Sequence, residues 1–523
     1  MGGAPCVPAF ATILAVQVCP TREAFVAQTL EGPPVQPVWC EVLDDGETPV
    51  AAFARLRAHG ASGLLESVLG GERWARYSFV MVGARARVVG RWQEGSLQVE
   101  VTPGEGFHVP DELRKGQGIE CLRRVFEHYR AALHSDQPPL WGGLVGAWGH
   151  DLVRCFENLP PPQGRTPSGV ASVDLMVTDT VVVFDTLTQR VRLVTATHAA
   201  DDGGAEAAYD AACERLARVR KALFEEPPVL GPLEPDEGVD FACEPAAPWT
   251  RDGFLASVHK AKEHVVAGDV FQVVLAQGFE VPRGNTDVLD VYRILRMTNP
   301  APYMVLLELS TAGLAGASPE VLVRFDRETR RITVRPIAGT RPRGRTEAED
   351  LALEEELLAD PKERAEHLML IDLGRNDVGR VAVGGTVKMG DSFAIERYSQ
   401  VMHIVSEVTG TLAPGLDAMD ALRATFPQGT LSGAPKVRAL EIIDALEPAE
   451  RGWYGGAVGY VSFDGGADFA ICIRSALALP DRYRVQAGAG IVFDSDPETE
   501  DTECRNKAAA VLRAIAMAKG KGT

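Results

Sequence analysis

The chain has 523 residues, 46% of them hydrophobic, and its 53 Lys and Arg against 72 Asp and Glu give a formal net charge of −19. This length suits two or more domains or one large two-layer fold. Because no cluster of Lys and Arg interrupts the acidic background, nucleic acid and anionic membrane surfaces are poor candidates as partners.

The start of the chain does not have the pattern of a signal peptide. The apolar run from Val7 to Val18 is broken by Pro8, and no Lys or Arg precedes Arg22, so the positively charged start is missing. No stretch approaches the ~18 apolar residues needed to cross a bilayer. The nine cysteines lie far apart without a C-x-x-C pair, which favours a reducing compartment. We therefore expect a soluble cytoplasmic protein with residues 1–20 as an N-terminal extension.

Strand patterns dominate the first half of the chain. The runs Tyr77–Val82, Val173–Phe184 and Val191–Thr195 are rich in the β-branched residues that sheets favour. The glycine-rich segment 141–157 predicts a strand that leads into a tight turn. An amphipathic helix is expected from Glu206 to Phe224.

Residues 225–249 are rich in Pro, Glu and Gly and are typical of a linker. They divide an N-terminal domain, 21–224, from a C-terminal domain, 250–523, whose first helix begins near Thr250. Because βα units do not alternate regularly, we predict an α+β fold with large, mostly antiparallel sheets. Strands of the second half are predicted at Val270–Leu275, Met304–Leu309, Val321–Phe325, Ile332–Ile337, Ala457–Phe463, Phe469–Leu477 and Tyr483–Ala487.

Two segments each carry a pair of glutamates one helical turn apart. Glu363 and Glu366 lie in DPKERAEHLML, and Glu500 and Glu503 lie in DPETEDTECRNK. An Asp-Pro start predicts a helix in both, and residues i and i+3 share a helix face. Two such helices facing each other would supply four carboxylates, an oxygen site suited to Mg²⁺. Two simpler interpretations stay open, namely a capping-box role for Glu363 and an exposed pair between Glu503 and Lys507.

Glu366 also belongs to an apolar pattern. With Met369, Leu370 and Leu373 it has the i, i+3, i+4, i+7 spacing of a buried helix face. A carboxylate within such a face is costly unless a cation or good donors contact it. This cost is a second reason to expect a cation beside Glu366.

Other residues of the second half are typical of contacts to anions or polar ligands. Gly488-Ala489-Gly490 would let backbone N–H groups approach an anion, as in a nest. Arg474 is predicted on a strand among small residues, with either a ligand carboxylate or an internal ion pair as its partner. His403 fits either a satisfied core histidine or a catalyst. The segment TLSGAPK from Thr430 is a weak cue for a phosphate or carboxylate.

Taken in order, GASPE, PIAGTRPRG, EHLMLIDLGRND, FPQGTLSGAPK and GAGIVFDSDPETE resemble the corresponding segments of the chorismate-utilising enzymes, most closely the anthranilate synthase component I branch. The resemblance runs from about Leu64 to the end of the last helix. It implies a sandwich of antiparallel sheets with helices outside. It also implies Mg²⁺-dependent conversion of chorismate and ammonia to anthranilate and pyruvate, the first committed step of tryptophan biosynthesis.

The resemblance implies a role for each matching residue. Glu366 and Glu503 match direct Mg²⁺ ligands, with Glu363 and Glu500 beside them. The residues that match substrate contacts are Gly339, Thr340, Thr430, Tyr454, Arg474, Gly488, Ala489, Gly490 and Lys507.

Catalytic roles follow from the same resemblance. Glu320 matches the general acid that protonates the departing 4-hydroxyl group, and His403 matches the group that takes the C2 proton. Gln272 occupies the place of the lysine base in water-using isochorismate synthases, and a glutamine cannot activate water. Ala338 stands where aminodeoxychorismate synthases carry a nucleophilic lysine.

The residues at positions 272 and 338 favour anthranilate synthase over aminodeoxychorismate or isochorismate synthase, which stay as alternatives. A catalytically silent metal-buffering scaffold is the alternative from another class.

Two further segments resemble the tryptophan feedback site of the family. These are LLES at 64–67 and NPAPYM at 299–304, although the first could simply pack between strands. The residues expected to line the site are Ser67, Pro302, Tyr303 and Met304.

The chain has no G-x-C-x-G segment typical of a glutaminase nucleophile, so the resemblance implies a separate glutamine amidotransferase subunit as partner and a hetero-oligomer.

Overall fold

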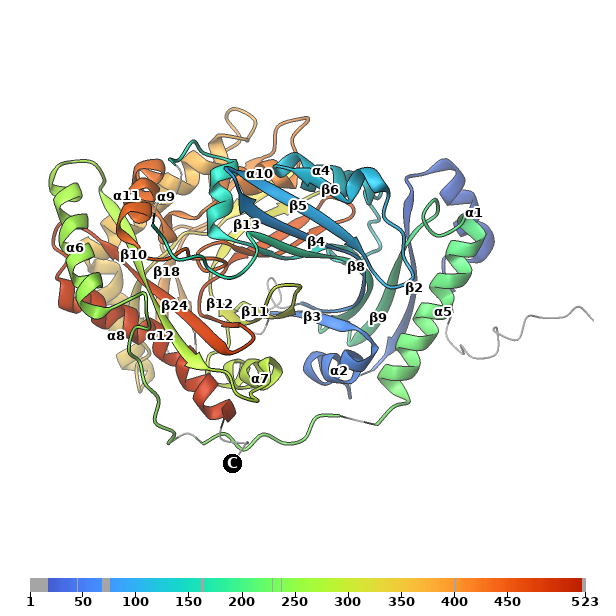
Figure 1. The fold of residues 1–523 in the computed structure, drawn as a ribbon, viewed down its shortest axis with the longest axis horizontal. Coiled ribbons are helices and arrows are strands. Elements are labelled where there is room, and N and C mark those ends of the chain that lie inside the picture. Colours follow the sequence, from blue (N-terminus) through green and yellow to red (C-terminus); the bar gives the residue numbers. More distant parts are fainter. Residues whose placement is uncertain are drawn as a thin grey trace, which may run out of the picture.

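The computed structural model describes residues 17–44, 46–67, 76–160, 164–227, 229–236, 238–398 and 401–519, and it confirms the predicted α+β fold (Figure 1). One extended, antiparallel sheet system contains most of the strands. A separate three-stranded sheet consists of β15 (Ile337–Pro342), β18 (Val401–Val405) and β17 (Ala394–Arg397). Within the described ranges, no helix combines the length and apolar character needed to cross a membrane.

The two long strands β4 (Tyr77–Gln93) and β8 (Val173–Asp185) pair with each other at the centre of the sheet system. Most of their β-branched and apolar residues are buried, as the sequence predicts. Strands β9 (Arg190–His198), β2 (Val35–Leu43) and β1 (Val18–Cys19) continue from β8. Val18 and Cys19 of the expected N-terminal extension therefore belong to the sheet, and residues 1–16 lie outside the described residues.

Two arms of strands leave this centre. The first arm consists of β3 (Ala61–Glu66), β11 (Tyr303–Glu308), β12 (Gly313–Ser318), β23 (Ser475–Ala478), β24 (Arg482–Ile491), β10 (Gln272–Pro282) and β20 (Gly433–Ala434). The second arm consists of β7 (Gly143–Trp148), β21 (Ala457–Ser462), β22 (Ala467–Ile471), β13 (Val321–Asp326), β14 (Arg331–Val334), β19 (Val408–Thr411) and β16 (Lys388–Met389). Short strands β5 (Ser96–Pro103) and β6 (Lys115–Gln117) pair beside β4.

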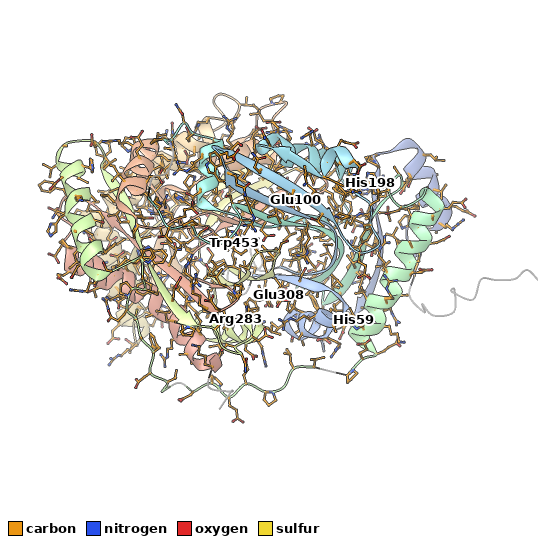
Figure 2. The ribbon with its side chains drawn as sticks, viewed as in Figure 1. His59, Glu100, His198, Arg283, Glu308 and Trp453 are labelled. Carbon is orange, nitrogen blue, oxygen red and sulfur yellow. The ribbon has the colours of Figure 1, made fainter. Side chains whose placement is uncertain are left out.

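An apolar layer lies between the two arms. It includes Leu307 and Leu314 of the first arm and Val458 and Ala470 of the second. Trp453 is buried in this layer and donates from Nε1 to Ala171 O over 2.9 Å (Figure 2). This arrangement is the sandwich that the resemblance implies.

Helices cover the outer faces of the sandwich. The core outside the first arm contains residues of α1 (Arg22–Glu31), α2 (Pro49–Leu56), α5 (Ala205–Phe224), α7 (Val288–Thr298) and α12 (Pro497–Lys519). A second core covers the second arm and the ends of β10 and β24. It contains residues of α4 (Ile119–His128), α6 (Arg251–Val266), α9 (Pro361–Gly379), α10 (Ala418–Thr425) and α11 (Lys436–Leu446). Helix α8 (Glu347–Ala359) packs on the three-stranded sheet instead.

Two predicted strands are wrong in their extent. The run Ile332–Ile337 splits into β14 and β15, which belong to different sheets, because Pro336 has no N–H to continue a ladder. The run Phe469–Leu477 splits into β22 and β23, because the chain crosses there from the second arm to the first. Arg474, at this crossing, has a left-handed φ of 52°.

The segment between α5 and α6 has no helix or strand among its described residues, and it follows the lower edge of the molecule in Figure 1. Strands from either side of it pair directly, β3 with β11 and β7 with β21. The division into two domains at 225–249 therefore stays a prediction. Helix α6 begins as expected, with Thr250 accepting a hydrogen bond from Gly253 N.

Candidate active site

The Asp-Pro segments begin helices α9 and α12, as predicted. The Asp360 carboxylate accepts from the backbone N–H groups of Lys362 and Glu363 over 2.9 and 3.3 Å. Asp496 likewise accepts from Thr499 N over 3.0 Å at the start of α12. Capping by these aspartates therefore fixes the starts of the two helices whose first two turns carry the glutamate pairs.

The four glutamates influence one another electrostatically. Burial raises the pKa of Glu366, and the nearby charges of Glu363 and Glu503 raise it further. Burial and the charge of Glu503 raise the pKa of Glu500 in the same way. Such mutual repulsion between carboxylates is relieved by a cation, so the donor set fits Mg²⁺. Within the described residues, however, no three of these carboxylates converge as a ready metal-binding group.

Two of the glutamates have basic partners in the structure. Lys507 Nζ lies 2.5 Å from Glu503 Oε1 and also donates to Gly488 O over 2.9 Å. Arg341 Nη1 donates to Glu363 Oε1 over 3.2 Å. The alternative pair between Glu503 and Lys507 is therefore present, whereas the capping-box alternative for Glu363 is wrong because its carboxylate turns toward Arg341.

The predicted burial pattern around Glu366 is shifted by one position. Glu366, Met369 and Leu373 are half-buried, whereas the face of α9 in the core is made by other residues. That face consists of His367, Leu370, Ile371, Gly374, Asp377 and Val378. Glu366 therefore lies at the margin of the core face.

Glycines on β24 allow two side chains to approach the strand closely. A Cβ at Gly490 would lie 2.5 Å from Gln272 Nε2, and a Cβ at Gly488 would lie 3.1 Å from Tyr454 Oη. Gln272 Nε2 in turn donates to Glu366 Oε1 over 3.4 Å. The predicted nest is wrong, because these residues are in extended strand and neither glycine has a positive φ.

Glu320 is buried immediately before β13. Thr430 Oγ1 donates to Glu320 Oε1 over 3.1 Å. Burial raises the pKa of Glu320 to about 8, although the Thr430 hydrogen bond and the charge of Lys507 oppose this shift. At neutral pH the carboxyl group is therefore mostly protonated and can donate a proton.

His403 lies on β18, opposite a bulge in β15 at Gly339, which has a φ of 69°. His403 Nδ1 lies 3.0 Å from Gly339 O and 3.1 Å from Thr340 Oγ1. Because a carbonyl oxygen only accepts, Nδ1 carries the proton, and Nε2 of the neutral ring carries the lone pair. Burial lowers the pKa of His403, which favours this neutral form.

Arg474 lies at the crossing between the arms and not on a strand. Its Nη1 donates to Lys507 O over 2.7 Å, and burial lowers its pKa. No carboxylate in the described part of the chain forms an ion pair with it, so the internal ion pair is wrong as an explanation. A ligand carboxylate as its partner stays a prediction.

The charge of Lys507 acts on three of the buried carboxyl groups of this region. Burial raises the pKa of Glu320, Glu366 and Glu500, and the positive charge of Lys507 opposes the shift in all three. A Cβ at Gly339 would lie 3.2 Å from Glu363 Oε2, which places the β15 bulge beside α9. The structure thus brings the predicted metal, substrate and catalytic residues into one region between α9, α12 and the ends of β13, β18 and β24.

One buried ion pair behind this region was not predicted. Arg451 lies 2.5 Å from Glu447 and donates to Leu431 O and Val274 O over 2.5 and 2.8 Å. Its guanidinium carbon is 5.9 Å from the Tyr454 ring centroid. The pair therefore holds together the segment after Thr430, strand β10 and Tyr454. Its i, i+4 spacing is visible in the sequence, but exposed surface pairs have the same spacing.

The residues expected to bind tryptophan line one cavity of about 860 Å³. β3 and β11 bring them together, with Met304 opposite Glu66. Tyr303 donates to Asp468 Oδ1 over 2.8 Å at the cavity wall. The same cavity reaches Pro319, which precedes Glu320, and Tyr398, whose ring is 5.6 Å from that of His403. Tyr398 was not predicted from the sequence.

Comparison with known proteins gives concordant results. The model of the chorismate binding enzyme family matches residues 92–513. The chain is 45% identical over 490 residues to anthranilate synthase component 1 of Aquifex aeolicus, covering 93% of this chain and 95% of that protein. It is 44% identical over 507 residues to the Pseudomonas putida protein of the same name, covering 95% and 99%.

Solved structures agree with these sequence similarities. Anthranilate synthase component I from Streptococcus pneumoniae superposes with a TM-score of 0.69 at 32% identity, covering 90% of this chain and 98% of that chain. The menaquinone-specific isochorismate synthase of Escherichia coli superposes with a TM-score of 0.67 at 17% identity, covering 94% and 99%, which shows the fold alone.

Proposed function

Since the chain belongs to the chorismate-binding enzyme family, and within it to the anthranilate synthase component 1 enzymes, we propose that it converts chorismate and ammonia to anthranilate and pyruvate with Mg²⁺. The observation that carries this proposal is that burial shifts the pKa values of two groups in one region in opposite directions. Burial keeps Glu320 protonated and His403 neutral near neutral pH. A site with an acid and a base poised in this way suits two successive proton transfers.

The proposed metal ligands are Glu366 and Glu503, with Glu363 and Glu500 beside them. When bound, Mg²⁺ supplies positive charge that holds the ring carboxylate of chorismate and offsets the repulsion among the glutamates. The amide of Gln272 donates to Glu366 and fixes one of its oxygens.

The side chains carry out the remaining steps. Glu320 gives its proton to the 4-hydroxyl group as ammonia adds at C2. His403 then takes the C2 proton at Nε2 as pyruvate leaves, while Gly339 O holds the opposite ring nitrogen. The guanidinium group of Arg474, which has no internal carboxylate partner in the part of the chain described, binds the enolpyruvyl carboxylate.

Product analysis tests this proposal directly. The purified chain with chorismate, Mg²⁺ and ammonium is expected to form anthranilate and pyruvate, identified by fluorescence and mass. With glutamine in place of ammonium it is expected to be inactive until an amidotransferase subunit is added. Formation of isochorismate or aminodeoxychorismate would contradict the proposal, and glutamine-dependent turnover by the chain alone would contradict the separate partner.

Glu366→Gln is expected to weaken Mg²⁺ binding by at least about tenfold, because a neutral amide replaces a charged ligand. Turnover should fall in parallel while the melting temperature is retained. Calorimetric titration of Mg²⁺ measures the change, and Glu498→Gln, an exposed position on the first turn of α12, is the matched control. Loss of turnover with folding intact excludes the catalytically silent scaffold, whereas an unchanged rate would contradict the proposed role of Glu366.

We also propose that tryptophan binds the 860 Å³ cavity and inhibits the enzyme, since this volume lies within the usual range of roughly 300–1,000 Å³ for small-molecule sites. Ser67→Phe places a ring at the cavity wall and should raise the tryptophan concentration for half-inhibition by about tenfold or more. The uninhibited rate serves as the control. Absence of both inhibition and calorimetric binding at millimolar tryptophan would overturn the regulatory proposal.

A further inference from the structure

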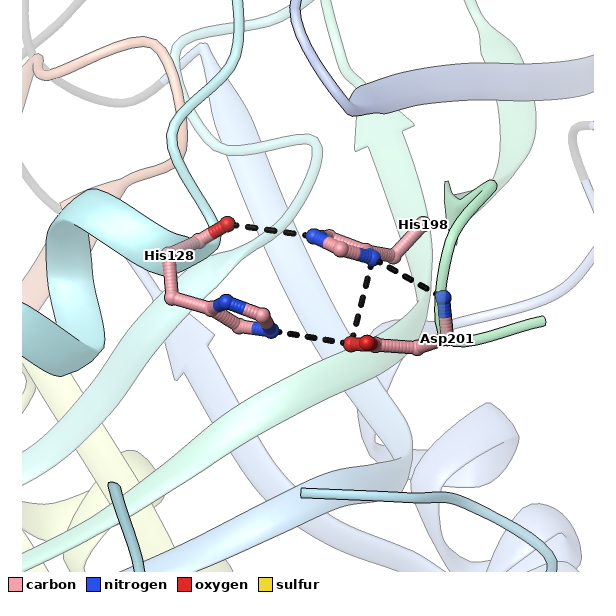
Figure 3. A group of neighbouring side chains, drawn as sticks. All are labelled: His128, His198 and Asp201. Carbon is pink, nitrogen blue, oxygen red and sulfur yellow. Dashed lines mark hydrogen bonds and ion pairs between the residues drawn. The ribbon is translucent and has the colours of Figure 1, made fainter. Parts of the chain in front are cut away.

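Three metal-ligating side chains converge in the N-terminal half, away from the proposed active site. They are His128, the last residue of α4, His198, the last residue of β9, and Asp201 in the turn that follows (Figure 3). One ligand atom from each lies within 4.8 Å of the other two. Nothing in the proposed reaction uses this group, and Figure 2 shows His198 toward the right of the view, whereas helices α9 and α12 lie toward the left in the same view in Figure 1.

Both imidazole rings direct a nitrogen toward the same carboxylate oxygen. His128 Nε2 lies 2.9 Å and His198 Nδ1 lies 3.1 Å from Asp201 Oδ2. The rings stack at a centroid distance of 4.5 Å with an interplanar angle of 24°, so the two nitrogens face the carboxylate side by side.

The hydrogen bonds around His198 determine which nitrogen can bind a cation. His198 Nε2 lies 3.2 Å from His128 O, a carbonyl that only accepts, so Nε2 carries the proton. Nδ1 of the neutral ring therefore has a lone pair, which accepts a hydrogen bond of 3.3 Å from Asp201 N and also lies 3.1 Å from Asp201 Oδ2. A lone pair opposite a carboxylate oxygen is repulsive unless a proton or a metal ion lies between them. A ring N–H held by a carbonyl is also the usual outer contact of a metal-binding histidine.

Among the described residues, the Asp201 carboxylate has only the two histidines as direct partners, with the charge of Arg85 nearby. Arg85 pairs with Asp202, and Arg215 pairs with Asp179 at 3.1 Å, so these neighbouring charges balance each other. The side chains of His198 and Asp201 are 4% and 7% exposed, whereas His128 is 20% exposed. The group thus opens to solvent on the His128 side, where a metal ion can enter and keep a water molecule.

We propose that His128, His198 and Asp201 bind one transition-metal ion of the Zn²⁺ class, with a water molecule as the fourth ligand. Two imidazole nitrogens and one carboxylate oxygen suit Zn²⁺ or Co²⁺ better than Mg²⁺. Bonds of about 2.0–2.1 Å in a tetrahedral site separate ligand atoms by roughly 3.3 Å. The two nitrogen-to-oxygen separations of 2.9 and 3.1 Å are close to this value, and all three ligand atoms lie within 4.8 Å of one another. The ion would join the end of α4 to the end of β9.

Co²⁺ titration tests the proposal, because tetrahedral nitrogen and oxygen ligands give it characteristic visible absorption bands. EDTA-treated full-length protein is titrated in excess Mg²⁺, which occupies the oxygen-rich site. We expect one Co²⁺ per chain with tetrahedral bands and a higher melting temperature, since an ion that binds only the folded state stabilises it. Glu366→Gln should keep this Co²⁺ signal, which separates the result from the proposed function.

Asp201→Asn is expected to weaken Co²⁺ binding at least about tenfold and to remove the tetrahedral bands. His128→Gln changes the most exposed of the three ligands. If Asp201→Asn does not fold, the Co²⁺ affinity of His128→Gln is measured instead. Asp210→Asn on α5, an exposed position that pairs with Arg22, is a matched control that should bind Co²⁺ like the unmodified chain. The proposal is overturned if the unmodified chain shows no tetrahedral Co²⁺, or if folded His128→Gln binds Co²⁺ with the same affinity and spectrum.

Discussion

Glu320→Gln is expected to lower kcat for anthranilate formation by about 10²–10⁴-fold, the usual contribution of a positioned general acid. The amide keeps the shape of the carboxyl group and can still accept the hydrogen bond from Thr430. It cannot transfer a proton to the departing hydroxyl group. Steady-state kinetics with ammonium and chorismate measure the loss, and KM for chorismate should change much less than kcat.

The pH profile distinguishes this role from a structural one. Because burial raises the pKa of Glu320 to about 8, the active protonated form is lost as the pH rises through that value. Burial lowers the pKa of His403, so the acidic limb of the profile lies below the ordinary histidine range. The unmodified enzyme should show a bell-shaped profile, and Glu320→Gln should lose the alkaline limb and keep the acidic one. An alkaline limb retained in the variant would contradict the assignment.

The same substitution has a predictable effect on stability. Between the unfolded and folded pKa values the unfolded chain releases the Glu320 proton and the folded chain keeps it, so stability falls as the pH rises through about 8. Glu320→Gln cannot ionise and avoids this loss. Its melting temperature relative to the unmodified chain should therefore be higher at pH 9 than at pH 5.

Glu447→Gln is expected to lower the free energy of unfolding by about 3–5 kcal/mol, because it leaves a buried guanidinium group without its counter-charge. Arg451 is 1% exposed, and Glu447 also accepts a hydrogen bond from Ala276 N over 2.9 Å. Urea unfolding measures the change. Glu441→Gln on α11, the helix that ends just before Glu447, is the matched control. Glu441 is in a more exposed pair with Arg438, so this change should cost at most about 1 kcal/mol.

A double substitution checks the mechanism of this loss. Replacing both partners by apolar residues, Glu447→Leu with Arg451→Met, removes the unpaired charge and should recover part of the stability. KM for chorismate should nevertheless be raised in the double variant, because methionine at position 451 cannot donate to the carbonyl groups of Leu431 and Val274. If Glu447→Gln cost no more than the Glu441→Gln control, the pair would not hold these segments together.

The features that could be predicted from the sequence are those that depend on neighbouring residues or on the family pattern. Asp360 and Asp496 begin their helices as expected, because capping involves only the next few residues. The wrong predictions depend on distant parts of the chain. Arg474 was expected on a strand, but the crossing between the arms is set by the packing of the whole sandwich. Gly488 permits close contact with Tyr454 rather than forming a nest.

The residues that were missed have no distinctive pattern of their own. Arg451 and Tyr398 acquire their places only when segments far apart in the sequence meet. His128, His198 and Asp201 are similar, because more than one element separates His128 from His198 in the chain. Spacing rules for metal sites rely on ligands within one motif, so a site assembled from α4, β9 and a turn gives no such signal.

The pairing of β7 with β21 limits how early in synthesis the sheet can be completed. Leu144 of β7 pairs with Val461 of β21. About 300 more residues must therefore be synthesised after Leu144 before the edge of β7 is covered. At roughly 5–20 residues per second, the ribosome needs about 15–60 s for this stretch. The edge of β3 is open from an earlier point, because Leu64 pairs with Leu306 of β11, about 240 residues later in the chain. The nascent N-terminal half therefore has unpaired strand edges for tens of seconds, and such edges can pair with other chains during that time.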